Sequence, residues 1–468
     1  MGIVHVSKHD RYQIEIKSQM LASRLGDKNE QVDMWLFLPP ALGIAPAEYS
    51  NTQFYSDLRT YTRLKTPFFN IEDLLSSSES PLVLLERRIG EVPSAQVQRV
   101  LRQEIKLMTT IVRKIEMPDG TNIPLDLLQT VLNRWRIVHS TLSQKTLLPK
   151  TIACLNIADE VLSNYWEMSL IGDESTDDVS IERQQLLKEE VAYRESQGYL
   201  IYNKHKKEQY LFHYGNLVKY VSTVLYLDTK VDVSSRWLRH LAFGLAAGLA
   251  MVWALFVQIY ALFRLGVDLG EGMSVHLIST FVGIGIFSYI LKDRIKATTG
   301  RWLTDLLNRK MPDRTKQFYV DDEEIPMSYS DEKTRFVKVR DLPEDIQDVY
   351  QNFQEWNPYF MFGSDVLHYQ QKRTTHVKLA RQHFPRFRGV VHIHRFHVWN
   401  WIKTLAPPKK EIVVVNANGK VERCKAPRIY TVNLMTKTTM GSQSEYKLFR
   451  VLLNNRGLVA VEPVVFTS

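Results

Sequence analysis

Two histidines with strand spacing are the first residues that could do chemistry. The run Val390–Val398 is predicted to be a strand, and side chains two residues apart on a strand share a face, so His392 and His394 point the same way. Two imidazoles on one face can bind one metal ion. However, no Asp or Glu occurs between Asp365 and Glu411, and the nearby arginines repel a divalent cation. We therefore treat His392 and His394 as weak metal candidates, beside ordinary strand histidines or anion contacts, and predict no metal and no cofactor.

The same region interleaves arginine with aromatic residues, a mixture that neutralises phosphate and stacks on planar groups. The predicted anion-binding residues are Arg381, Arg386, Arg388, Arg395, Trp399 and Trp401. Three interpretations stay open: a solvated basic surface over an aromatic core, contact with anionic lipid headgroups, and contact with a nucleic acid or nucleotide.

Known catalytic signatures are missing from the sequence. It contains no phosphate-binding Gly-x-x-x-x-Gly-Lys-Ser/Thr loop, no Gly-x-Ser-x-Gly elbow, no His-Glu-x-x-His pair and no dinucleotide fingerprint. A site assembled from distant residues would leave no such motif. The question of an enzyme is therefore open, and the prediction leans toward a non-enzymatic protein.

Two long apolar segments are the elements that position these residues. Leu241–Phe263 and Met273–Leu291 are each long enough to cross a bilayer as a helix, for which about 20 residues suffice. Only a helix satisfies its backbone polar groups within one segment in lipid. We predict a two-helix transmembrane hairpin with a short turn, and the competing interpretation is a pair of buried helices in a soluble core.

Basic residues flank the outer ends of this hairpin. Those before the first segment are Lys219, Lys230, Arg236 and Arg239, and those after the second are Lys292, Arg294, Lys296, Arg301, Arg309 and Lys310. The turn between the segments contains Arg264 alone. Because Lys and Arg collect on the cytoplasmic side, we expect an inner (plasma) membrane location with both termini cytoplasmic.

Small residues occur at helix-contact spacing inside the segments. Gly244 and Gly248 form a Gly-x-x-x-Gly motif, and the second segment contains Gly283. Small side chains let helices approach closely in lipid, where the hydrophobic effect does not drive association. The motif fits packing between the two segments and equally fits self-association of protomers.

Charge is unevenly spread along the 468 residues. The formal net charge is +9, and residues 372–468 alone hold 18 Lys or Arg against four Glu. Such a basic region favours an anionic partner. The two cysteines, Cys154 and Cys424, imply no disulfide framework.

The spacing of apolar residues along the chain predicts a membrane α+β protein with five regions. We expect a small mixed α/β region over 1–92, a helical bundle or stalk over 93–236, the transmembrane hairpin over 237–294, a juxtamembrane helix and acidic linker over 295–345, and a basic, antiparallel β-rich cytoplasmic domain over 346–468. Within the last of these, one or two helices are expected between 341 and 382, and Ala417-Asn-Gly-Lys420 predicts a hairpin turn.

These features together predict a non-enzymatic, cytoplasm-facing integral membrane protein. It would self-associate as a homo-oligomer and bind an anionic partner, either anionic lipid or nucleic acid, through its C-terminal domain, as a scaffold, sensor or membrane-acting effector. The alternative is a membrane-anchored enzyme that acts on a phosphate-bearing or nucleic-acid substrate through the same domain.

The expected topology can be tested with one introduced cysteine. In intact cells, the Asp268→Cys variant should react with an impermeant thiol reagent, because the turn faces outside. Cys154 and Cys424 should stay protected until the cells are opened. Labelling of the native cysteines in intact cells, with protection of position 268, would invert the topology.

Overall fold

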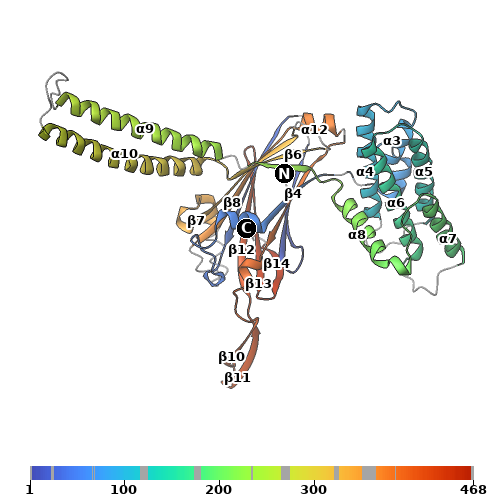
Figure 1. Cartoon of the computed structure of the whole chain (residues 1–468). Helices are drawn as coiled ribbons and strands as arrows, with labels where there is room; N and C mark the ends of the chain where they lie inside the picture. Colours follow the sequence, from blue (N-terminus) through green and yellow to red (C-terminus); the bar gives the residue numbers. More distant parts are fainter. Residues whose placement is uncertain are drawn as a thin grey trace.

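The computed structural model describes residues 3–22, 26–65, 67, 69–115, 125–172, 181–232, 236–264, 275–320, 326–349, 365–384 and 386–464. Figure 1 shows a central β domain that contains both chain ends, with a helical hairpin projecting on one side and a helical bundle on the other. The fold is thus mixed α+β, with antiparallel sheets and a β-rich C-terminal region.

The elements have the following bounds. The strands are β1 (Ile3–Lys8), β2 (Gln13–Leu21), β3 (Lys28–Phe37), β4 (Leu58–Leu64), β5 (Asp228–Asp232), β6 (Arg314–Tyr319), β7 (Ser328–Lys338), β8 (Asp365–Thr375), β9 (Gly389–His397), β10 (Lys409–Val415), β11 (Val421–Pro427), β12 (Tyr430–Met440), β13 (Gln443–Asn454) and β14 (Gly457–Val464). The helices are α1 (Asn51–Asp57), α2 (Ile71–Ser76), α3 (Pro81–Arg88), α4 (Ala95–Ile115), α5 (Leu125–Ser143), α6 (Pro149–Ile171), α7 (Ile181–Ser196), α8 (Lys207–Thr223), α9 (Arg236–Arg264), α10 (Val275–Lys310), α12 (Val377–His383) and α13 (Trp399–Ile402).

The described strands of the β domain form two antiparallel sheets and a separate two-stranded hairpin. The larger sheet has the order β14-β13-β12-β3-β8-β7-β6-β5, and the smaller has the order β1-β2-β9-β4. β10 pairs with β11 as the hairpin predicted from the Asn-Gly turn.

Each sheet combines strands from both ends of the chain. β3 lies between β12 and β8, and β9 lies between β2 and β4. The sequence-based division treats 1–92 and 346–468 as separate regions, whereas their strands share the same ladders here. Local periodicity reports which residues face a core but not which strand lies alongside, and this accounts for the difference.

A close backbone approach marks one place where the ends meet. Gly457 has φ +145° and begins β14, and a Cβ at this position would lie 2.5 Å from the carbonyl oxygen of Arg11. The amide of Leu458 donates to that same oxygen at 2.8 Å. Only glycine fits here, because both the backbone angle and the space exclude a side chain.

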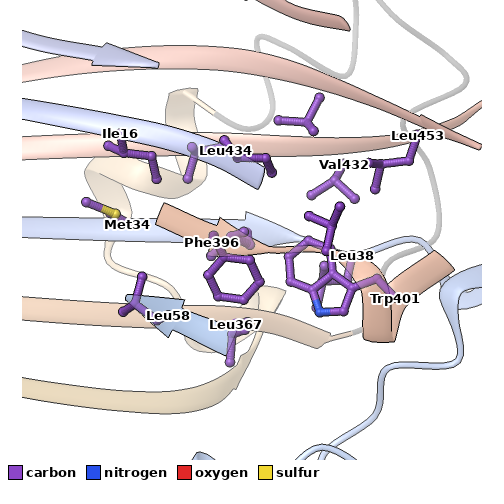
Figure 2. Close-up of a cluster of buried hydrophobic side chains, with 14 of the residues drawn as sticks. Ile16, Met34, Leu38, Leu58, Leu367, Phe396, Trp401, Val432, Leu434 and Leu453 are labelled. Atoms are coloured by element: carbon purple, nitrogen blue, oxygen red, sulfur yellow. The ribbon is translucent and has the colours of Figure 1, made fainter. Parts of the chain in front are cut away.

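The main apolar core lies between the two sheets. Figure 2 shows side chains from both ends of the chain meeting there, among them Ile16, Leu58, Leu367, Phe396 and Leu434. Trp401 of α13 is fully buried, with its ring centroid 4.7 Å from that of Phe396. The core therefore requires residues from β2, β4, β8, β9 and β12 at once.

The helical bundle agrees closely with its prediction. Helical periodicity of the apolar residues predicts helices near 94–116, 123–143 and 149–169. These correspond to α4, α5 and α6, and their apolar stripes form one cluster. Inside it, the indole Nε1 of Trp135 donates to Asp159 Oδ1 at 2.9 Å, which satisfies the polar tip of a buried ring.

Both helical parts are insertions near one edge of the larger sheet. The bundle lies between β4 and β5 in the chain, and the helical hairpin lies between β5 and β6, which pair antiparallel at that edge. β6 begins four residues after α10 ends. The hairpin thus extends directly from two paired strands.

The two helices of the hairpin pack through alanines. The buried positions of α9 are Ala242, Ala246, Ala250, Ala254 and Ala261. A Cβ built on Gly300 of α10 would lie 3.1 Å from the ring of Phe243, so these two residues lie side by side. Gly300 comes nine residues after Leu291, the predicted end of the second span. The start of α9 therefore runs beside the polar extension of α10.

Within the described residues, one helix is long and apolar enough to cross a membrane, the stretch His240–Ala261 of α9. The predicted second span, Met273–Leu291, begins outside the described residues and continues as the first half of α10. The predicted turn also lies outside the described residues.

Two local predictions differ from the structure. Residues 313–345, expected to be a linker, contain β6 and β7. The apolar spacing of Phe54–Arg63 predicts one short helix, but the helix ends at Asp57 and the chain continues as β4. The helices expected between 341 and 382 correspond to the helical residues 344–349 and to α12, with β8 between them. In β6, β7 and β8 the buried positions hold many polar residues, so the apolar alternation that signals a strand is absent.

Candidate functional site

A layer of buried polar side chains crosses the space between the two sheets. On β2, β4 and β9 the inward-facing positions are apolar at one end of the strand, polar in the middle and apolar at the other end, and on β8 they change from apolar to polar along the strand. We call this layer the polar belt, and its members are Ser18, Glu30, Thr60, Thr62, Arg314, Lys316, Ser330, Glu332, Gln371, Arg373, His392 and His394. The belt lies between two apolar clusters of the same domain.

Arg373 of β8 connects several members of the belt. Its guanidinium Nη1 donates to Glu30 Oε2 and to Ser18 Oγ, both at 2.9 Å, and its Nε donates to Gln371 Oε1 at 2.8 Å. The Arg373 and Glu30 side chains are both 0% exposed. A buried ion pair is tolerated when hydrogen bonds satisfy its remaining groups, and Arg373 meets that condition through β2, β3 and its own strand.

A second ion cluster joins β6 to β7. Glu332, also 0% exposed, accepts from Arg314 Nε at 2.6 Å and lies 2.7 Å from Lys316 Nζ. Lys316 further donates to the hydroxyl of Thr60 on β4 of the facing sheet. Burial lowers the pKa of Lys316 to about 8, although the charge of Glu332 opposes this. The belt thus holds three cations against two carboxylates.

The predicted histidines lie inside the belt. His394 Nε2 donates to Gln371 Oε1 at 2.9 Å, and His392 Nδ1 lies 2.8 Å from Thr62 Oγ1. Burial lowers the pKa of both imidazoles well below the usual range, and the positive charge of Arg373 adds to the effect. Both rings are therefore neutral at pH 7.

Neutral imidazoles are competent metal ligands, but the belt supplies little else for a cation. The described residues contain no group of three His, Cys, Asp or Glu that could hold a metal ion. The carboxylates nearest to the two rings are already paired with Arg373, Arg314 and Lys316. The ion pairs and hydrogen bonds of the belt hold the two sheets together.

Arg314 and Lys316 place the belt next to the helical hairpin. Both lie on β6, the strand that follows α10. A shift of α10 along its axis would therefore act on residues that hold β6 against β7 and β4.

The predicted anion-binding residues occupy different places along β9. Arg381, Arg386 and Arg388 precede the strand, whereas Trp399 and Trp401 follow its other end. Arg388 and Trp399 are exposed, and Trp401 is buried in the core. The six residues therefore do not converge on one surface.

Two of the arginines are bonded within the β domain, one to a carboxylate and one to a backbone oxygen. Arg395 Nε donates to Glu15 Oε2 at 2.9 Å across the β2–β9 ladder. Burial alone would raise the pKa of Glu15, but hydrogen bonds from Lys17 and Arg395 lower it below its usual value. Arg381 donates to the backbone oxygen of Ala22 at 3.2 Å.

Arg386 connects the β domain to the helical bundle. Its Nε lies 3.2 Å from Glu104 Oε1 of α4, and both side chains are below 10% exposed. Burial raises the pKa of Glu104 to about 7, although the charge of Arg386 opposes this. The contact makes Arg386 a residue of the junction between these two parts.

The predicted helix-association residues are exposed. Gly244 and Gly248 face away from α10, and a Cβ built on either glycine would meet nothing within 4 Å. Gly283 of α10 is exposed as well. The two helices pack through the alanines of α9 instead.

The residues that sequence reasoning missed are the charged members of the belt. Lys316, Glu332 and Arg373 lie on strands with several polar inward positions, whereas Glu30 precedes the apolar inward positions of β3. β7 gives no local signal, because Ser328, Ser330, Glu332 and Thr334 alternate with residues that are polar as well.

Comparison of the chain with protein-family models, with characterised proteins and with solved structures finds no match.

Removal of one belt carboxylate should destabilise the β domain. In the Glu332→Gln variant, Arg314 and Lys316 lose their buried counter-charge, a change that typically costs about 3–5 kcal/mol. Hydrogen exchange of β6, β7 and β8 in the full-length protein measures this loss locally. Asp341→Asn is the matched control, because Asp341 pairs with Arg340 at the surface and its loss should change exchange by less than about 0.5 kcal/mol. Equal protection in both variants would contradict the role of the belt.

The neutral histidines predict acid sensitivity. Below pH ~6.5 the unfolded chain protonates His392 and His394, while the folded chain keeps them neutral, so the unfolded state binds more protons. Stability is thus fully present above pH ~6.5 and falls below it, by up to about 1.4 kcal/mol per pH unit for each histidine. The drop in thermal midpoint between pH 7.5 and pH 5 should be larger for the natural protein than for the His392→Gln, His394→Gln double variant. An equal drop in both proteins would refute this assignment.

Proposed function

We propose that this protein is a non-enzymatic, cytoplasm-facing integral membrane protein that self-associates and binds an anionic partner through its basic β domain. It acts as a scaffold, sensor or membrane-acting effector, and α9 and α10 are its transmembrane hairpin.

One observation carries the membrane assignment: the apolar surface of α9 is not covered by protein. The stretch His240–Ala261 has a mean hydropathy of 2.0 and only 22% of it is buried. Val252 and Phe256 are 66% and 63% exposed, and on α10 Phe287 is 65% exposed. A core helix of a soluble protein is mostly buried, so these values favour lipid as the covering medium.

The stagger of the two helices indicates which part lies in the bilayer. Because Phe243 lies beside Gly300, the apolar half of α10 runs beside the later part of α9. The bilayer then covers the end of α9 and the start of α10, while the first turns of α9 and the basic half of α10 lie at the cytoplasmic surface. Lysine and arginine there favour anionic headgroups.

The exposed glycines support self-association. Gly244 and Gly248 are not used between α9 and α10, which leaves their face free for another copy of the chain. Small residues on this face would let a helix of a second copy approach closely at the cytoplasmic end of the hairpin.

The most exposed basic element of the β domain supports an anionic partner. The hairpin β10–β11 contains five Lys or Arg and two Glu over residues 409–427, and the side chains of all seven are exposed. Of the six residues predicted from the sequence, Arg388 and Trp399 retain the exposure that a partner requires.

The alternative function is an enzyme that acts on a phosphate-bearing or nucleic-acid substrate. The polar belt favours it, because a lysine with a pKa of about 8 and neutral histidines are typical of catalytic sites. It ranks second because the belt ions pair with one another and the described pockets lie in the bundle and at its junction with the β domain.

A charge inside α9 tests the membrane assignment. Phe256→Arg should reduce insertion by about 2.5–3.5 kcal/mol if residue 256 lies in the hydrocarbon core, so the variant should become extractable by alkaline carbonate. Phe212→Arg is the matched control, because Phe212 is a 73% exposed phenylalanine on α8 of the bundle. It should remain in the membrane fraction. Release of the natural protein by carbonate would remove the membrane assignment.

A further inference from the structure

The hairpin β10–β11 is an exposed arm at one end of the β domain. Among the described residues, β10 and β11 pair with each other and with no other strand, and nearly every residue of both is exposed. The arm is rooted just before β12, where the amide of Arg428 donates to the backbone oxygen of Pro408 at 2.7 Å. Figure 1 shows the arm leaving the β domain beyond β13, away from both helical parts.

Other basic segments lie at the same end of the domain. Tyr430, the first residue of β12, pairs with Leu453 near the end of β13, and the turn to β14 follows. In that turn, the backbone oxygen of Arg456 accepts from Nε of Arg11, which lies in the turn between β1 and β2. We call this surface the basic end, and it consists of residues 8–11, 403–428 and 454–457.

The positive charge of the basic end is not neutralised within the domain. The basic end contains ten Lys or Arg against three Asp or Glu, and nine of the ten cations are exposed. Elsewhere on the domain, cations pair with carboxylates, as in Arg395–Glu15 and Lys437–Asp345. Among the described residues, none of the ten has such a partner. A cation cluster of this size favours a polyanion, whose phosphates release counterions when the protein binds.

The position of the basic end favours a soluble polyanion over lipid headgroups. In the larger sheet, β3, β8 and β7 separate β12, beside the arm, from β6, which follows α10. At 1.5 Å per residue, the stretch of α10 from Lys292 to Lys310 is about 27 Å long, and it holds the β domain away from the apolar half of the helical hairpin. The arm does not run back toward that half (Figure 1).

The shape and side chains of the arm match a groove of duplex DNA. The major groove of B-form DNA is about 12 Å wide and admits a two-stranded β-ribbon. Lys409, Arg423 and Lys425 share one face of the arm, where they can reach the phosphates along the groove. Val415 and Asn418 lie at the tip. Apolar side chains contact the thymine methyl group in this groove, and asparagine hydrogen-bonds adenine.

We propose that the basic end binds duplex DNA, with the arm in the major groove and its cations on the phosphate backbone. This inference rests on the proposed function, in which the β domain binds an anionic partner, and it identifies the class of that partner. The major groove of an RNA duplex is deep and narrow, so it excludes the arm. DNA should therefore bind more tightly than RNA of the same sequence.

Neutralisation of the arm tests the site in the full-length protein, held in nanodiscs of neutral phosphatidylcholine. Binding of a short fluorescent DNA duplex is followed by anisotropy at several salt concentrations. The triple variant Lys409→Gln, Arg423→Gln, Lys425→Gln should bind at least about tenfold more weakly at about 100 mM salt, and its slope of log affinity against log salt should fall by about three. All three side chains are exposed, so the fold should be unchanged.

A second triple variant separates the arm from net charge. Lys188→Gln, Lys204→Gln and Lys207→Gln remove three exposed lysines in or beside α7 and α8 of the bundle. This control has the same total charge as the arm variant, and its affinity and salt slope should equal those of the natural protein. Equal losses in the two triple variants would show that net charge alone attracts DNA, and would overturn the proposal.

Two other ligands test the class of partner. An RNA duplex of the same sequence should bind the natural protein more weakly than the DNA duplex, and equal binding would reject insertion of the arm into the groove. Vesicles of anionic phosphatidylglycerol are the lipid probe. Flotation with these vesicles that is lost in the arm variant, together with no binding of DNA, would identify lipid as the partner and refute the proposal.

Carbonate extraction separates this proposal from the membrane assignment. If the natural protein binds DNA through the arm but is released by carbonate, the DNA site stands and the membrane anchor fails. If the natural protein stays in the membrane fraction and binds no DNA, the DNA site fails alone.

Discussion

The buried pair Arg373–Glu30 joins the two ends of this chain, and the rest of the β domain depends on it. Glu30 lies on β3 near the start of the sequence, and Arg373 lies on β8 near its end. Both side chains are 0% exposed, and Arg373 Nη1 donates to Glu30 Oε2 at 2.9 Å. Either charge alone would be strongly destabilising in that position. The pair is therefore stable only when β3 and β8 are adjacent in the correct register, and Ser18 and Gln371 extend the same condition to β2 and the neighbouring groups.

This constraint explains how one small β domain carries two large helical insertions. The bundle is inserted between β4, at the edge of the smaller sheet, and β5, at the edge of the larger sheet, and the helical hairpin is inserted between β5 and β6. Lys316 and Glu332 extend the ionic contacts to the edge of the larger sheet, so β6 is held where α10 ends. Movement of α10 would thus act on the belt through β6.

Much of the helical architecture could be predicted from the sequence, and the β architecture could not. The bundle helices have apolar stripes in steps of three and four, and this signal is local. The hairpin β10–β11 was likewise predicted by its Asn-Gly turn, and β9 corresponds to the predicted strand Val390–Val398. β6, β7 and β8 were missed because Lys316, Glu332, Gln371 and Arg373 occupy inward positions where a strand normally has apolar residues. The pairing of β3 with β8 spans more than 300 residues, and no local pattern encodes it.

For the candidate functional residues as well, local patterns predicted the local geometry but not the surroundings in the fold. The shared face of His392 and His394 was predicted correctly from period two, but their environment depends on Arg373 and Lys316, which local patterns do not bring together. The interleaved arginines and aromatics looked like one surface, whereas Trp401 lies in the core and Arg386 contacts the bundle. The surfaces that remain exposed are the hairpin β10–β11 and the apolar face of the helical hairpin.

A double-mutant cycle between Glu30 and Arg373 tests the central claim most directly. Glu30→Met, Arg373→Met and the double variant would be compared by hydrogen exchange of β3 and β8 in the full-length protein. Each single change leaves an unpaired buried charge, so each should cost about 3–5 kcal/mol, and the double variant should cost less than their sum by at least about 2 kcal/mol. Two small and additive losses would show that the ends of the chain do not meet through this pair, and would contradict the account.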